Sequence, residues 1–233
     1  MKRLMVLATL AASVTGCVAN QGDAPVRFLG VRSLKSESGG CSLGDFQLAQ
    51  GSLDVSGGGT YLMGVNIETN TVPRPIIINN ETFSSGGLND INLQEVVLTY
   101  QSQPSLPLPA EDRIPFYAVF RPGTTGEDSY ALMYAIGPQA LAVLRDPAVL
   151  PVGGPPVTVL ATIKAVGRFS GGMPVETNAI TFPIIVRNSG YNPQTNACAV
   201  AGQSPVGLEG PCGQVGQDTG GICRVPPPPS TTP

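Results

Sequence analysis

Apolar residues recur at every second position in the clearest segments of this chain, and glycine and proline interrupt the pattern at short intervals. Successive side chains of a β-strand point to opposite faces of a sheet, so this period predicts strands with one buried face. In one such segment the predicted inward row is Tyr61, Met63, Val65 and Ile67, and the outward row is Gly64, Asn66 and Glu68. The 29 glycines and 23 prolines favour turns and oppose long helices.

Two more alternating segments flank a turn sequence at residues 170–174, which predicts a hairpin. Their apolar rows are Val157, Val159, Ala161, Ile163 and Ala165, and Ile180, Phe182, Ile184 and Val186. Further strands are predicted over residues 26–34, 48–55, 74–79, 91–100 and 116–120. A change of apolar phase in the fourth of these predicts a β-bulge near Glu95. Pro138 and the Ala- and Leu-rich residues 139–145 predict one short helix.

About nine short strands separated by turns predict an all-β fold, an antiparallel two-layer β-sandwich, because βαβ units would need repeated crossover helices. The pattern is broadly similar to immunoglobulin and fibronectin type III domains with Greek-key connections, although the chain has no Trp for the Cys-Trp-Cys landmark of true immunoglobulin domains. We expect this domain to span residues 25–187. A Cys- and Gly-rich C-terminal appendix follows at residues 188–225, and a Pro-rich disordered tail at residues 226–233.

The first residues have the pattern of an export signal. Lys2 and Arg3 precede an apolar run at residues 4–14, which is much shorter than the roughly 20 residues of a membrane span. The segment Val14-Thr15-Gly16-Cys17 resembles the lipobox of bacterial lipoproteins. The resemblance implies cleavage of residues 1–16 by the lipoprotein signal peptidase and attachment of lipid to Cys17, with acyl chains such as palmitate. Residues 17–24 would then form the lipidated tether to the membrane.

By the same resemblance, the residue after the lipidated cysteine bears on sorting. Lipoproteins of Gram-negative cells that carry Asp at this position are retained at the inner membrane, whereas this chain carries Val18. We therefore expect a cell-envelope protein that is lipid-anchored at the outer membrane.

The cysteines fit an oxidising compartment. The chain has five, and lipid on Cys17 leaves four that can form two disulfides in three connectivities: Cys41, Cys198, Cys212 and Cys223. We favour Cys41 with Cys198, which ties the start of the domain to its end, and Cys212 with Cys223, which holds a Gly-rich segment. No metal site is predicted, because the chain has no C-x-x-C pair and no histidine.

Charge and motifs argue against several function classes. Without Lys2 and Arg3 the chain has 11 basic and 16 acidic residues, and the basic ones are scattered, so no nucleic acid partner is expected. Residues 40–44 match the G-x-S-x-G spelling of a hydrolase elbow, but that site needs a histidine base and the chain has none. A carboxylate pair for glycoside hydrolysis would have to come from Glu111, Asp112, Glu127 and Asp128. Oxygen ligands for calcium could add Asn89, Asp90 and Asn92.

We therefore predict no catalytic residues and no cofactor. The expected function is that of a lipid-anchored, non-catalytic module of the cell envelope, structural or engaged with an envelope protein partner. The Pro-rich residues 104–109 are one candidate recognition segment. The alternatives are a receptor for a small molecule or calcium and, less favoured, a hydrolase that uses carboxylates.

Overall fold

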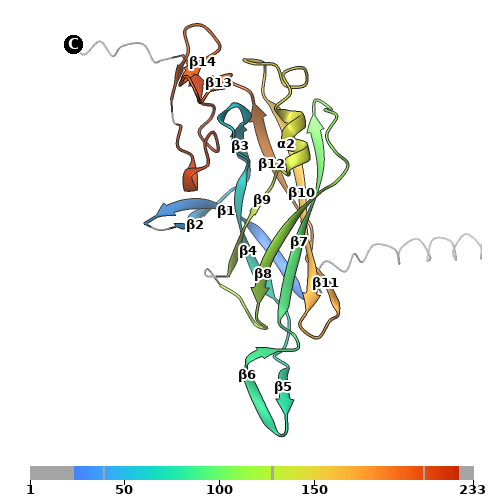
Figure 1. Ribbon diagram of the computed structural model, residues 1–233. Helices are drawn as coiled ribbons and strands as arrows, with labels where there is room; N and C mark the ends of the chain where they lie inside the picture. Colours follow the sequence, from blue (N-terminus) through green and yellow to red (C-terminus); the bar gives the residue numbers. More distant parts are fainter. Residues whose placement is uncertain (1–23, 39, 127–128, 207, 226–233) are drawn as a thin grey trace, which may run out of the picture.

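The computed structural model describes residues 24–38, 40–126, 129–206 and 208–225, and it has an all-β architecture (Figure 1). A four-stranded sheet has the order β2 (Gly40–Gln47), β1 (Val26–Glu37), β4 (Leu62–Thr69), β9 (Tyr130–Tyr134). A six-stranded sheet has the order β3 (Gly51–Asp54), β12 (Ile180–Arg187), β10 (Val157–Phe169), β7 (Ile91–Gln103), β8 (Asp112–Phe120), and β11 (Pro174–Glu176) also pairs with β10. Neighbouring strands in both sheets are antiparallel except β3, which runs parallel to β12.

Three two-stranded pairs lie outside these sheets. β5 (Pro75–Ile78) and β6 (Glu81–Gly87) form a hairpin that projects beyond the lower end of the sandwich in Figure 1. β13 (Tyr191–Asn192) pairs with β14 (Ala197–Cys198), and β15 (Ser204–Pro205) pairs with β16 (Cys223–Arg224), both within the appendix. The helices among the described residues are α2 (Pro138–Leu144) and two 3₁₀ turns, η1 (Val55–Gly57) and η2 (Pro211–Gly213).

The hydrophobic core lies between the two sheets, and the predicted alternating rows supply much of it. The inward row of β4 is at most 1 % exposed, and Val159, Ala161, Ile163 and Ala165 of β10 are fully buried. β10 and β12 pair as predicted, with β11 inserted after the turn. The bulge is also confirmed, because the register of β7 against both neighbours shifts between Leu93 and Glu95. The short helix is confirmed as α2.

The strands β2, β6, β9 and β11, and the short strands of the appendix, were not among the predicted ones. In addition, no helix in the described part of the chain is long and apolar enough to cross a bilayer. The lipobox and Cys17 lie outside the described residues, as do Glu127 and Asp128.

All four described cysteines form disulfides, but the favoured pairing was wrong. The bonds join Cys41 to Cys212 and Cys198 to Cys223, with Cα–Cα distances of 5.3 and 5.8 Å. The reason is the path of the appendix, which returns to the β1–β2 hairpin, where the backbone N–H of Cys212 donates to Ser36 Oγ at 2.8 Å. Ser36 is paired with Cys41 across the hairpin, so Cys212 meets Cys41 there.

Candidate interaction surface

The appendix covers the edge strand β3 of the six-stranded sheet. Asp54 N–H donates to the carbonyl of Gly216 at 2.9 Å, and Asp218 N–H donates to the carbonyl of Ser52 at 2.8 Å. Leu53 also forms an antiparallel bridge with Gln217. The protein therefore uses an extended segment of its own chain to pair the backbone groups of β3.

The same segment extends the four-stranded sheet. β1 pairs with β4 only as far as Arg32–Gly64, and the next residue of β4 on that side is Leu62. There the buried side-chain amide of Gln217 pairs the backbone of Leu62 as a neighbouring strand would. Its Oε1 accepts from Leu62 N at 2.8 Å and its Nε2 donates to Leu62 O at 2.7 Å. Beside it, Tyr61 Oη donates to Asp218 Oδ2 at 3.1 Å. Burial raises the pKa of Tyr61, and the charge of Asp218 raises it further.

Asp54 is a buried carboxylate that joins η1, the start of the appendix and its end. Its Oδ1 accepts from Ser56 N and Ser189 N, both at 3.2 Å, and from Ser56 Oγ at 2.6 Å. Its Oδ2 accepts from Ile222 N at 2.8 Å. Asp54, Ile222 and Ser189 are 0, 0 and 7 % exposed. This site is structural, because every one of these contacts is internal to the protein.

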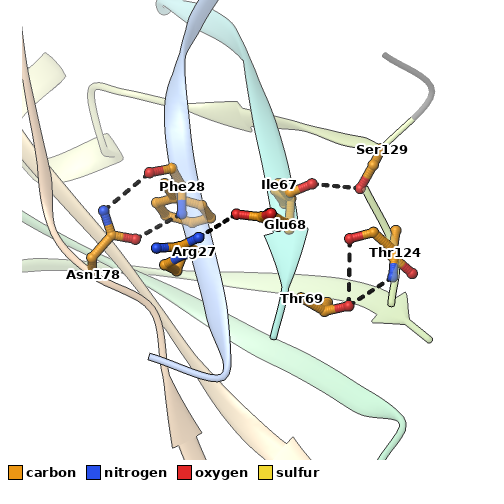
Figure 2. Close-up of polar contacts among 8 residues, drawn as sticks. All are labelled: Arg27, Phe28, Ile67, Glu68, Thr69, Thr124, Ser129 and Asn178. Carbon is orange, nitrogen blue, oxygen red and sulfur yellow. Dashed lines mark hydrogen bonds and ion pairs between the residues drawn. The ribbon is translucent and has the colours of Figure 1, made fainter. Parts of the chain in front are cut away.

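A second side-chain amide pairs backbone groups of β1 (Figure 2). Asn178 Oδ1 accepts from Phe28 N at 2.7 Å, and its Nδ2 donates to Phe28 O at 3.0 Å. Asn178 lies between β11 and β12, so this contact ties the two sheets together. The protein thus pairs backbone groups of β1 by itself, as it does those of β3 and β4.

On the opposite lateral side, where the two sheets end in β8 and β9, the described chain covers only one part of the strand edges. The β8–β9 connection follows the end of β4, where Ser129 Oγ donates to Ile67 O at 2.6 Å and Thr124 N donates to Thr69 Oγ1 at 2.8 Å (Figure 2). Beyond it, β8 pairs with β7 alone and β9 with β4 alone within the described chain. Each of these two strands therefore has a second edge without a neighbouring strand.

Side chains of both strands line a groove of about 320 Å³. The lining residues are almost all apolar: Leu62, Val96, Ile114, Pro115, Phe116, Tyr117, Leu132, Met133 and Tyr134. Tyr117 is 85 % exposed and Tyr134 is 41 % exposed. Tyr117 also borders a second hollow, together with the 66 % exposed Val119. This groove is the candidate functional site.

The charged groups next to β8 are already paired with each other. Arg113 contacts Glu95 and Glu111, each at 2.6 Å, and these pairs raise the pKa of the exposed Arg113, with Glu111 the larger influence. The groove therefore offers apolar side chains and strand backbone rather than a charged ligand-binding cluster.

Asp112, a predicted candidate acid, supports α2 instead of facing the groove. Its carboxylate is 1 % exposed and accepts from Ala140 N at 3.0 Å, which caps a helix whose N-cap residue, Gly137, has no side chain. Gly137 N donates to Tyr100 Oη at 2.8 Å. Burial raises the pKa of Tyr100, and the charge of Asp112 raises it further.

Among the described residues, the structure does not bring the candidate acids and amides together into a site. Exposed Glu111 pairs with Arg113, whereas Asp112 points into the core. The side chains of Asn89 and Asn92 bond to Val72 O and Ser170 Oγ, and Asp90 accepts from Gly87 N. Within the described residues no group of three or more His, Cys, Asp or Glu could hold a metal ion.

The G-x-S-x-G spelling also lacks the geometry of a hydrolase elbow. Residues 40–44 lie within the strand β2, and Cys41 is held in its disulfide. No protein-family model, curated protein or solved structure matches this chain.

Proposed function

We propose that this protein is a lipid-anchored, non-catalytic module of the cell envelope that binds an extended segment of another envelope protein in the groove between β8 and β9. The observation that carries the proposal is an asymmetry. On one lateral side the appendix pairs β3 and β4, which leaves β2 as the strand there without a second neighbouring strand in the described chain. On the other side two strand edges and an apolar groove have no such cover in the described chain.

An extended peptide suits this groove for two reasons. A free strand edge offers backbone N–H and C=O groups that an added strand can pair, and alternate side chains of that strand can fill apolar pockets. Pro115, which has no N–H, lies on β8, and such prolines are confined to edge strands within sheets. It also limits indiscriminate pairing along this edge, which favours a partner with a defined register.

The envelope location rests on the lipobox at Val14-Thr15-Gly16-Cys17, with Val18 favouring the outer membrane. Two disulfides are consistent with an oxidising compartment outside the cytoplasm. For the anchor, the Cys17→Ala chain should lose acyl-chain labelling and move from the membrane to the soluble fraction. Unchanged labelling would contradict the anchor.

The groove is tested by photo-crosslinking in intact cells with p-benzoylphenylalanine in place of Tyr117. The matched control replaces Phe46 of β2, an aromatic residue that is 74 % exposed and lies outside the groove. We expect the probe at 117, and not at 46, to crosslink a single extended peptide, identified by mass spectrometry. A synthetic copy of that peptide should bind the purified protein, and Leu132→Asp should weaken the binding at least tenfold. Identical crosslinks at both positions, or none, would contradict the proposal.

A further inference from the structure

The β5–β6 hairpin exposes isoleucines on both of its faces. Ile77 pairs with Thr82 and Ile78 with Glu81, and the turn between the strands is made by Asn79 and Asn80 with φ of 50° and 65°. Successive strand residues point to opposite faces, so the adjacent isoleucines cannot share one buried face. Ile77 is 63 % and Ile78 is 51 % exposed.

Other apolar side chains extend this exposed surface. Val72, in the segment that leads to β5, is 77 % exposed, and Met173, in the turn between β10 and β11, is 58 % exposed. That turn is tied to the exit of the hairpin, because Gly171 N donates to Leu88 O at 2.9 Å. A two-stranded hairpin is at best marginally stable in water, and clustered exposed apolar residues mark interaction sites.

The hairpin lies at the end of the sandwich where the chain enters the domain (Figure 1). Val26, the first residue of β1, pairs with Thr69, the last residue of β4, and Asn70 N donates to Pro25 O at 2.9 Å. From Asn70 the chain continues directly into the segment that leads to β5. The tether from Cys17 therefore joins the domain at the end that carries the exposed isoleucines.

The distances are compatible with membrane contact at this end. Six residues separate Cys17 from Ala24, and the seven Cα–Cα steps between these two can span at most about 25 Å. A strand of four residues, the length of β5, extends about 13 Å. A lipid on Cys17 would thus hold the hairpin within reach of the same leaflet. Exposed Arg74, at the base of the hairpin, can meet lipid phosphates.

We propose that the β5–β6 hairpin inserts Ile77 and Ile78 into the leaflet that holds the lipid anchor, and thereby fixes the orientation of the sandwich at the membrane. This inference rests on the proposed lipid anchor. It adds a second membrane contact and directs the opposite end of the sandwich away from the lipid.

The chain has no Trp, so a single introduced Trp reports on its own surroundings. The lipidated full-length Ile77→Trp protein is reconstituted into vesicles of phosphatidylethanolamine and phosphatidylglycerol with brominated acyl chains. The matched control is Phe46→Trp, at an exposed site on β2. We expect a blue-shifted emission and several-fold stronger quenching at position 77 than at position 46. Equal quenching at the two positions would overturn the proposal.

Failure of the anchor is recognised separately, by acyl labelling and co-sedimentation measured on the same samples. If Cys17 carries no lipid, the unlipidated Ile77→Trp chain is tested at high vesicle concentration, where position 77 should still be quenched more than position 46. Adding Ile78→Asn should then weaken vesicle binding several-fold. A blue shift at position 77 with envelope extract, and none with protein-free vesicles, would overturn the lipid assignment in favour of a protein partner.

Discussion

Replacing Asp54 with Ala should detach the appendix from the sandwich at its most buried point. The substitution leaves Ser189 N and Ile222 N without an acceptor. Each buried unsatisfied N–H costs about 1–3 kcal/mol, and relief from burying the carboxylate offsets part of this, so we expect a net loss of about 3–4 kcal/mol. Asp54→Asn keeps one acceptor oxygen and should lose about half as much.

The assay is urea unfolding followed by far-UV circular dichroism at constant pH, with the disulfides intact. The control is Asp146→Ala, because Asp146 is exposed and its carboxylate accepts one local hydrogen bond, from Ala148 N at 2.9 Å. Asp146→Ala should lower the free energy of unfolding by less than about 1 kcal/mol. If Asp54→Ala is no more destabilising than the control, the appendix does not depend on this carboxylate and the reasoning is refuted.

Three further predictions concern the same region. Gln217→Ala should lower the free energy of unfolding in urea by about 2–4 kcal/mol, because it leaves the N–H and C=O groups of Leu62 that Gln217 bonds without a partner. A loss below about 1 kcal/mol would contradict this. Burial raises the pKa of Tyr61, so its contribution to the free energy of unfolding should be fully present below about pH 10 and decrease at higher pH. Tyr61→Phe should reduce that decrease in urea unfolding. Removing Cys41 and Cys212 together should lower the free energy of unfolding by about 5 kcal/mol, because their disulfide closes a loop of 171 residues. Removing Cys198 and Cys223, which close a loop of 25 residues, should lower it by about 3.5 kcal/mol. Thermal unfolding that reverses this order would contradict the loop argument.

The sequence was most informative where one face of a strand is buried and the other is polar. The rows of β4, β10 and β12 were predicted for this reason, and the phase change near Glu95 located the bulge. The disulfide pairing could not be predicted, because it depends on the path by which Cys212 returns to the β1–β2 hairpin. The Gly-rich segment between them favoured Cys223 as its partner, but long-range packing joins Cys212 to Cys41.

The candidate surfaces escaped prediction because their strands do not alternate. In β9 all five residues, Tyr130–Tyr134, are apolar, and its outward Leu132 and Tyr134 line the groove. In β5, three consecutive isoleucines give no buried face either. In both cases a strand that is apolar on two faces coincides with an exposed apolar surface. This loss of period is the signal that could have located both sites.

The appendix also has a consequence for the export that we propose. The Leu62 backbone groups that bond Gln217, and the Asp54 Oδ2 that bonds Ile222, wait for residues that are synthesised more than 150 residues later. In a chain exported as we propose, β3 and β4 would keep unpaired backbone groups, and Cys41 would lack its partner Cys212, until those last residues have crossed the membrane. The chain should therefore remain loosely folded, and so competent for threading through a translocation channel, until almost all of it has emerged.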